Sequence, residues 1–252
     1  MMNLDVEKEV KLKQKAKELR KKALDLAVEK KEGHLGGAFS AIELILALYD
    51  EILNPEDRFL LSKGHNCYPM YLKLRERGFN PTISGHPDID CANGICCTSG
   101  SLGHGPPIAA GMAFAKKLKQ EPGQVYVMVG DGECQEGTIW ETSFLAAHHK
   151  LTNLTLIVDH NKIQGSEKIE NVLSLGNLKQ KFESFGWHVL EIDGHSFGEI
   201  IPCLQYRHET KPVAIIAHTI KGKGVSFMEN NPQWHGGVPK EDQLNQAYVE
   251  LQ

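Results

Sequence analysis

The sequence predicts a doubly wound α/β fold, in which a mostly parallel sheet carries helices on both faces. Short β-rich runs alternate with helical patterns along most of the chain, and this alternation is typical of parallel strands joined by right-handed crossovers. The run 125–129 is apolar throughout, which suits a strand that is covered on both faces. No low-complexity linker, change of composition or internal repeat divides the 252 residues, so we expect residues 1–252 to form a single domain.

The chain is expected to begin with a long helix. Small and apolar residues recur at the spacing of one helical face over 4–31, and Gly33 follows as a stop signal. The N-terminal segment 1–31 is therefore assigned to this helix. A second helix is predicted to begin at Ser40, because Ser40 and Glu43 have the reciprocal spacing of a capping box just before an apolar run.

Strands and further helices are then expected in alternation. The β-rich runs lie at 58–61, 124–129, 154–159, 188–192 and 212–217. The helical patterns lie at 68–77, 103–119, 136–149, 175–185 and 197–207. The Gly- and Pro-rich stretch 221–240 is interpreted as a long functional loop. Because ligands of such sheets bind beyond the carboxyl ends of the strands, the residues that follow each strand carry the functional argument.

Composition and charge exclude several classes of protein. The chain has 28 Lys and Arg against 32 Asp and Glu, a net charge of −4, whereas a nucleic-acid-binding domain usually carries a clear basic excess. No apolar run approaches the roughly 18 residues that cross a bilayer, and the Lys- and Glu-rich start has no apolar signal core. We therefore expect a cytoplasmic protein that binds neither nucleic acid nor a membrane.

The six cysteines add little to this picture. Cys91, Cys96 and Cys97 form a cluster, but two adjacent cysteines after a gap of four match no common zinc spacing. In a chain without a signal peptide, reduced thiols are favoured over disulfides. We interpret the cluster as small buried thiols in a loop, with a zinc site as the less favoured alternative.

Polar residues follow two of the predicted strands. Gly130-Asp131-Gly132-Glu133 comes directly after the run 124–129, and Asn161 follows the run 154–159. Glycines and a helix N-terminus can receive a phosphate, but the Asp131 carboxylate would repel one unless a hard cation lay between them. The set therefore predicts Mg²⁺ joining Asp131 and the amide oxygen of Asn161 to a diphosphate. An ordinary Gly-Asp-Gly turn is the alternative for the first motif taken alone.

Other nucleotide-binding signals are poor. No Gly-x4-Gly-Lys-Ser/Thr motif is present. Gly100-Ser101-Leu102-Gly103-His104-Gly105 matches the dinucleotide pattern, but the preceding segment 92–99 is a Cys- and Asn-bearing loop rather than an apolar strand. We interpret 100–105 as a cofactor-facing loop of another kind.

Taken together, these motifs resemble those of the transketolase family. Gly130-Asp131-Gly132 followed by Asn161 is similar to the thiamine diphosphate fingerprint, and the similarity runs in order over nearly the whole chain. The segments that carry it are Gly33-His34, Leu61-Ser62-Lys63-Gly64-His65, Gly85-His86-Pro87, 98–105, 130–140, Lys221-Gly222-Lys223-Gly224 and Trp234-His235-Gly236.

The resemblance implies a cofactor, a cation and a set of site residues. The cofactor is thiamine diphosphate, and the cation is Mg²⁺, with Ca²⁺ or Mn²⁺ as substitutes. Asp131, Asn161 and the main-chain oxygen of Ile163 would hold the cation. Cofactor contacts are implied for His65, Gly100, Ser101, Leu102, Asp131, Gly132, Glu133, Asn161, Lys221 and His235. His34, His86 and His235 would line the substrate channel as catalytic residues, because imidazoles move hydroxyl protons near neutral pH.

The resemblance also implies a missing partner. A complete transketolase continues into a pyrimidine-binding domain and a C-terminal domain, and the glutamate that activates the cofactor belongs to the former. The chain therefore resembles the N-terminal subunit of a split transketolase, active only with a separate C-terminal subunit, in an α2β2 assembly. Glu136 matches a glutamate of the family's dimer interface. Sugar phosphates are the implied substrates, and a two-carbon ketol unit is the implied group transferred.

Several points stay open at this stage. His104 stands where the family usually has Gln, and the order around Gln164 differs from that in related chains, so neither residue receives a role. The donor and acceptor sugars are not defined. Alternative functions are a subunit of a 1-deoxyxylulose-5-phosphate synthase-like enzyme or of a 2-oxo-acid dehydrogenase, and a non-catalytic subunit that binds the cofactor only as a scaffold.

Overall fold

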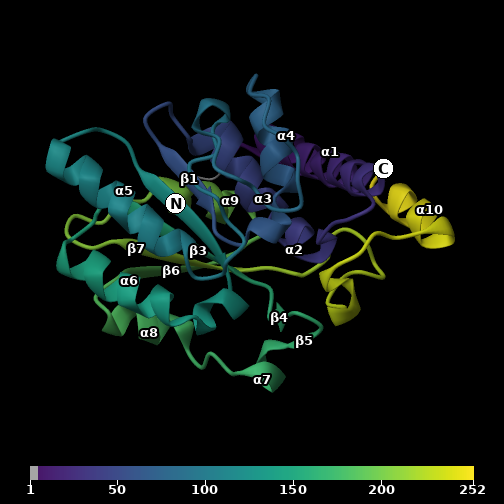
Figure 1. Cartoon of the computed structure of the whole chain (residues 1–252). Helices are drawn as coiled ribbons and strands as arrows, with labels where there is room; N and C mark the ends of the chain where they lie inside the picture. Colours follow the sequence, from purple (N-terminus) through teal and green to yellow (C-terminus); the bar gives the residue numbers. More distant parts are fainter. Residues whose placement is uncertain (1–4) are drawn as a thin grey trace.

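The structure is a computed structural model that describes residues 5–252 (Figure 1). Its first element is the helix α1 (Val6–Lys30), so the predicted N-terminal helix is confirmed except for residues 1–4, which lie outside the described residues. The side chain of Asp5 accepts a hydrogen bond from the backbone N–H of Glu7, and Lys31 ends the helix in the left-handed conformation. Both features are ordinary helix-terminus chemistry.

The described part of the chain contains one five-stranded sheet with the order β1-β2-β3-β7-β6, and all its pairs are parallel. Its strands are β1 (Arg58–Leu61), β2 (Val125–Gly130), β3 (Leu154–His160), β6 (His188–Asp193) and β7 (Val213–His218). Every predicted strand is present to within a residue or so. Helices cover both faces of this sheet, so the predicted fold class is confirmed.

Helices lie on both faces of the sheet (Figure 1), and two apolar cores fill the space between them and the sheet. One face packs against α5 (Gly105–Lys119), α6 (Gly137–His148) and α8 (Leu178–Ser184). The other face packs against α1, α3 (Ile42–Ala47), α4 (Tyr68–Glu76) and α9 (Phe197–Gln205). Within β2 the side chains alternate between the two layers, since Tyr126 and Met128 enter one core and Val127 and Val129 the other. The continuous apolar run of β2 thus serves two cores.

Shorter elements complete the chain. They are α2 (Leu35–Ser40), a π-helical turn (Leu48–Ile52), the antiparallel pair β4 (Ile163–Gln164) and β5 (Glu167–Lys168), α7 (Ile169–Val172), α10 (Glu241–Glu250), and 3₁₀ turns at Gly64–Asn66, Cys91–Asn93, Gly132–Gln135 and Pro232–His235. The sequence patterns did not predict α10 or the small hairpin. Within residues 5–252, no helix is both long enough and apolar enough to cross a membrane.

The predicted capping box at Ser40 and Glu43 is wrong. Ser40 is the last residue of α2 rather than the first of a helix, and its hydroxyl donates to the Asp159 carboxylate. Glu43 instead pairs with Arg20 and with His195. Both side chains are drawn to buried charged groups on other elements, and these tertiary interactions outweigh a local cap.

The cysteine cluster only partly matches its interpretation. All six thiols are free, but only Cys97 of the cluster is buried, while Cys91 is exposed and Cys96 intermediate. Among the residues that the structure describes, no group of three or more His, Cys, Asp or Glu side chains is arranged to hold a metal ion.

A buried ion pair ties α1 to α3. Arg20 Nη2 lies 2.7 Å from both carboxylate oxygens of Glu43, and both residues are buried. His195, which follows β6, lies with its Nδ1 3.0 Å from Glu43 Oε2. Burial acts to raise the pKa of Glu43, but Arg20 and His195 outweigh it, and the pKa is lowered. Glu43 is therefore charged in the folded chain and balances the buried guanidinium.

Replacing Glu43 by Gln should lower the free energy of unfolding by about 3–5 kcal/mol, because it leaves the Arg20 guanidinium buried without a compensating charge. The measurement is urea denaturation at pH 7. The matched control is Lys22→Gln, which breaks an exposed pair with Glu76 and should cost less than about 1 kcal/mol. Equal losses in the two variants would contradict a special role for the buried pair.

Candidate active site

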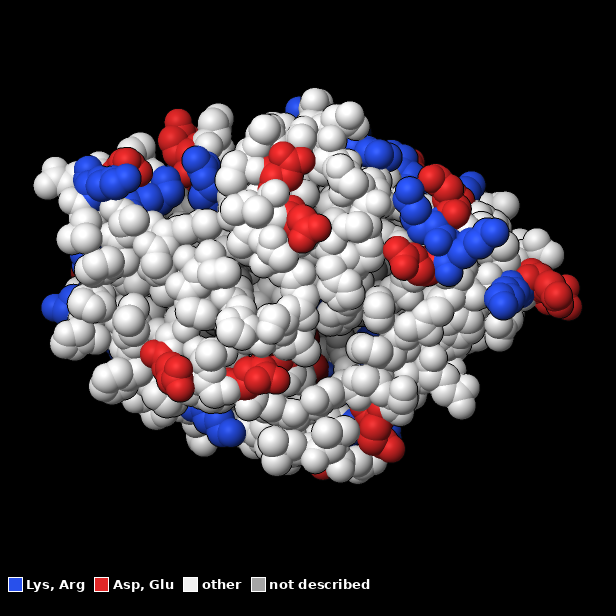
Figure 2. Space-filling model, in the orientation of Figure 1, with Lys and Arg blue, Asp and Glu red and all other residues white. Residues whose placement is uncertain are grey.

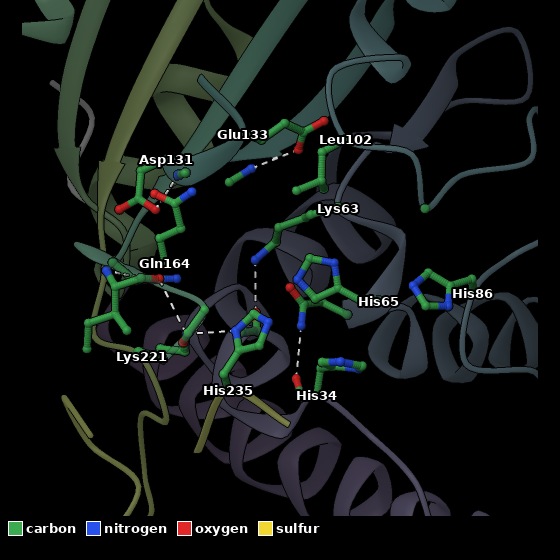
Figure 3. A pocket seen from close by; sticks show the side chains of 18 residues that line it. His34, Lys63, His65, His86, Leu102, Asp131, Glu133, Gln164, Lys221 and His235 are labelled. Atoms are coloured by element: carbon green, nitrogen blue, oxygen red, sulfur yellow. Dashed lines mark hydrogen bonds between the residues drawn. The ribbon is translucent and has the colours of Figure 1, made fainter. Parts of the chain in front are cut away.

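A cavity of about 380 Å³ opens at the carboxyl edge of the sheet (Figure 3). It brings together every residue predicted for the site except Ser101: His34, His65, His86, Gly100, Leu102, Asp131, Gly132, Glu133, Asn161, Ile163, Lys221 and His235. Ser101 is exposed and lies outside the lining. The view in Figure 3 has Asp131 and Gln164 on one side of the cavity and a group of histidines on the other.

The acidic side is built from the ends of two adjacent strands. Gly130 of β2 pairs with Asp159 of β3, so the residues that leave these strands, Asp131 and Asn161, lie together. One Asp131 oxygen accepts the N–H of Gly132 at 2.8 Å, and the other accepts the N–H of Lys162. These bonds fix the carboxylate at the cavity wall.

A tight turn after β3 adds a third oxygen. Lys162 has a positive φ of 66°, which reverses the chain and places Ile163 against the cavity. The amide oxygen of Asn161 accepts the N–H of Ile163 at 3.1 Å. Carboxylate, amide and main-chain carbonyl oxygens are the hard ligands that Mg²⁺ and Ca²⁺ take in proteins. The donor set therefore fits a divalent cation.

A buried lysine lies against the same oxygens. Lys221 Nζ is 3.3 Å from the carbonyl oxygen of Ile163, 3.4 Å from that of Gly165 and 3.1 Å from His235 Nδ1. Burial, followed by repulsion from Lys63, lowers the pKa of Lys221 to about 8. The main-chain carbonyl groups of Ile163 and Gly165 thus hold the Lys221 ammonium group. Because Lys221 lines the cavity, this group can reach an anionic ligand there.

Four histidines from separate segments meet at the other side. His34 precedes α2, His65 follows β1, His86 lies in the loop before α5, and His235 comes from the C-terminal tail. The centroid of the His34 ring lies 5.2 Å from that of His65, 6.2 Å from that of His86 and 5.4 Å from that of His235. Figure 3 shows the rings of His34, His65 and His235 close together, with His86 to one side.

Burial keeps three of these imidazoles neutral. Burial lowers the pKa of His34, and it lowers the pKa of His65 to about 2 and that of His235 to about 4. Neighbouring Lys and His side chains lower these pKa values further. A neutral imidazole carries one proton acceptor and one donor. The cluster can therefore accept a hydrogen bond from a ligand hydroxyl or donate one to its oxygen at neutral pH.

Glu133 lines the cavity, but its carboxylate makes hydrogen bonds within the protein. One oxygen accepts the N–H of Gly103 at 2.8 Å and the hydroxyl of Ser62, and the other accepts the N–H of Gly130 at 3.2 Å. Gly103 has a φ of 83°, and a Cβ there would lie 2.5 Å from the hydroxyl of Thr138. Glu133 thereby fixes the 100–105 loop against the strand ends.

Sequence reasoning missed Lys63 and left Gln164 undecided. Lys63 lies two residues after the end of β1, is buried, and pairs with Asp159. A lysine two residues after an apolar strand was the available signal. Gln164 lines the cavity and donates to Gln135 Oε1 at 2.9 Å, whereas His104 is exposed and lies outside the lining.

Comparisons with known proteins agree with this geometry. Residues 11–251 match the family described as "Transketolase, thiamine diphosphate binding domain". The chain belongs to the transketolase family. It is 37% identical to an apulose-4-phosphate transketolase subunit of Phocaeicola vulgatus, over 92% of this chain and 90% of that protein. It is 35% identical to a 6-deoxy-6-sulfo-D-fructose transketolase subunit of a Clostridium species, over 98% of each.

A solved transketolase structure shares the fold. The enzyme from Campylobacter jejuni superposes with a TM-score of 0.84 at 31% identity, and the match covers 95% of this chain but 42% of that one. This chain therefore corresponds to the thiamine diphosphate-binding part of a single-chain transketolase and to nearly the whole of the two relatives that are named as transketolase subunits. The family resemblance inferred from the motifs is confirmed.

The stability of the chain should fall as the pH drops below about 6.5. Unfolded histidines bind protons near that pH, whereas His65 and His235 do not until about pH 2 and 4 in the folded state. Between these values the unfolded state binds more protons, so acid favours it. Urea denaturation at pH 7, 6 and 5 should show the decline, and His235→Gln should make it shallower. His148→Gln, at an exposed histidine, should leave the slope unchanged, and equal slopes for all three proteins would contradict the explanation.

Proposed function

We propose that this chain is the thiamine diphosphate-binding subunit of a two-subunit transketolase, which transfers a two-carbon ketol unit from a ketose to an aldose. The observation that carries the proposal is the cavity in which three oxygen donors face a group of neutral histidines. The two relatives named as transketolase subunits, which this chain matches over 90% or more of their length, support the two-subunit form. Family membership favours this activity over synthase or dehydrogenase chemistry, and the retained site residues favour it over a scaffold.

The residues at the acidic side would hold the cofactor's diphosphate. Asp131, Asn161 and the carbonyl oxygen of Ile163 would bind Mg²⁺, or Ca²⁺ or Mn²⁺ in its place, and the cation would bridge to the diphosphate. The ammonium group of Lys221 lies beside these oxygens and adds a positive charge. Gly132, Gly100 and Leu102 would contact the cofactor as part of the cavity wall. Ser101 lies outside that wall, so we propose no cofactor contact for it.

The histidines would handle protons of the sugar. Thiamine diphosphate, when bound, supplies an electron sink for the carbon skeleton. His34, His86 and His235 would orient the sugar hydroxyls, take up their protons and donate hydrogen bonds to oxygens that become negative. The lowered pKa values of His34 and His235 keep both rings neutral at neutral pH, so that each has a free acceptor nitrogen for a sugar hydroxyl. His65, more deeply enclosed, would contact the cofactor.

The substrates are proposed to be anionic sugars. The same two relatives carry apulose-4-phosphate and 6-deoxy-6-sulfo-D-fructose in their names, which are sugars with a phosphate and a sulfonate group. By analogy, sugar phosphates of the pentose phosphate pathway are the first substrates to assay, and sulfonated sugars the second.

A partner protein would complete the site. It would contribute the pyrimidine-binding domain with its activating glutamate and the C-terminal domain, in an α2β2 assembly, with Glu136 as one contact. Ile108, Phe144 and Leu145 on α5 and α6 are 38–67% exposed, and Figure 2 shows a largely uncharged surface over the middle of these helices, with basic side chains at the far end of α5. Such an exposed apolar surface is typical of an interface.

Replacing Asp131 by Asn should weaken Mg²⁺-dependent binding of thiamine diphosphate by more than about 100-fold, since it removes the only carboxylate in the proposed ligand set. Isothermal titration calorimetry measures the affinity, with and without EDTA. Asp242→Asn, in the exposed first turn of α10, serves as the control and should bind normally. Unchanged cofactor binding and partner-dependent activity in the Asp131 variant would support the scaffold alternative.

The purified chain should show no ketol transfer until the C-terminal subunit is added, because the activating glutamate is expected on that subunit. A coupled spectrophotometric assay of the chain, the partner and the mixture tests this, and mass photometry of the mixture gives the stoichiometry. Full turnover by this chain alone would refute the two-subunit proposal.

A further inference from the structure

A fully buried aspartate joins several elements directly behind the cavity. The carboxylate of Asp159, in β3, accepts hydrogen bonds from the side chains of Ser40, Lys63 and Thr219. Ser40 ends α2, Lys63 follows β1, and Thr219 follows β7. Asp159, Ser40 and Thr219 all lie outside the cavity lining. They can therefore affect the site only through residues that do line the cavity.

The two oxygens of Asp159 have different partners. Oδ1 accepts the hydroxyl of Thr219. Oδ2 accepts hydrogen bonds from the hydroxyl of Ser40 at 2.6 Å, from the amide NH₂ group of Asn161 at 3.3 Å and from the ammonium group of Lys63. The same amide nitrogen lies 3.4 Å from Ser40 Oγ. Only the Oδ2 side of the carboxylate thus reaches Asn161.

These contacts decide which way the amide of Asn161 faces. An asparagine amide can rotate by a half-turn with little change of shape, and its hydrogen-bond partners select the orientation. With the NH₂ group held by Asp159 and Ser40, the amide oxygen lies on the opposite side, where it accepts the N–H of Ile163. The reversed amide would set its oxygen against the Asp159 carboxylate and its NH₂ group against the N–H of Ile163.

We propose that Asp159 and Ser40 are positioning residues that aim the amide oxygen of Asn161 at the cation of the diphosphate. This inference rests on the function proposed above. Neither residue touches the cation, and both act through Asn161. Outer partners that orient a metal ligand commonly change metal affinity about 10- to 100-fold, so their removal should weaken cation binding by a factor in that range.

The test compares two variants that each remove one hydroxyl donor from Asp159. Ser40→Ala removes a contact on the Oδ2 side and an acceptor of Asn161, whereas Thr219→Val removes the Oδ1 contact and leaves Asn161 untouched. Electron paramagnetic resonance measures the Mn²⁺ affinity of the full chain at saturating thiamine diphosphate. Ser40→Ala should weaken Mn²⁺ binding about 10-fold, and Thr219→Val should retain the wild-type affinity.

A third variant and a stability measurement separate positioning from folding. Asp159→Asn should weaken Mn²⁺ binding by about 10- to 100-fold. Thermal denaturation should show a modest loss for both variants, larger in Ser40→Ala, because Ser40 makes more buried hydrogen bonds than Thr219. Wild-type affinity in Ser40→Ala, or equal weakening in Ser40→Ala and Thr219→Val, would overturn the positioning role. Wild-type chain that binds no Mn²⁺ with the cofactor present would instead overturn the proposed function.

Discussion

The parallel register of β2, β3 and β7 is the constraint on which the site depends. Gly130, Asp159 and Ala217 stand side by side in this register, and all three strands run in the same direction. The three strands therefore end at the same edge of the sheet, and the polar residues that follow them, Asp131, Asn161 and Thr219, lie close together. A slip of one residue in β3 would turn the side chain of Asp159 to the opposite face and separate it from Ser40.

The cavity brings two lysine ammonium groups together with the carboxylates of Asp131 and Glu133. Lys221 and Lys63 lie within the same cavity as the imidazoles. Burial, followed by the charge of Lys63, lowers the pKa of Lys221 and of His65. Lys63 is balanced by Asp159, whereas Lys221 is held by main-chain carbonyl groups and His235. The chain thus keeps several charged groups between two apolar layers, and the ion pair of Arg20 and Glu43 joins α1 to α3 in one of these layers.

Most of the fold and the site followed from local signals in the sequence. Continuous apolar runs located the strands, and the Gly-His pairs and Gly-Asp-Gly located residues that the structure gathers into one cavity. The capping box failed because Ser40 and Glu43 satisfy buried charges that are distant in sequence, which no short pattern encodes. Lys63 stood in one of the matching segments but received no role, since only the folded chain shows that it pairs with Asp159. Ser101 was included because its neighbours matched a motif, although its own exposure depends on how the loop turns.

The C-terminal tail reaches the cavity through a small number of main-chain bonds. Gly237 donates to the carbonyl oxygen of Gly33, and Gly222 donates to that of Gly36, each at 2.8 Å. These contacts join segments about 200 residues apart, which makes them late events in a folding reaction that favours local contacts. On the ribosome, the sheet and most of its helices can form before the tail emerges. Lys221 and His235 are therefore among the last residues of the pocket to be synthesised, and the pocket cannot be complete until the tail has emerged.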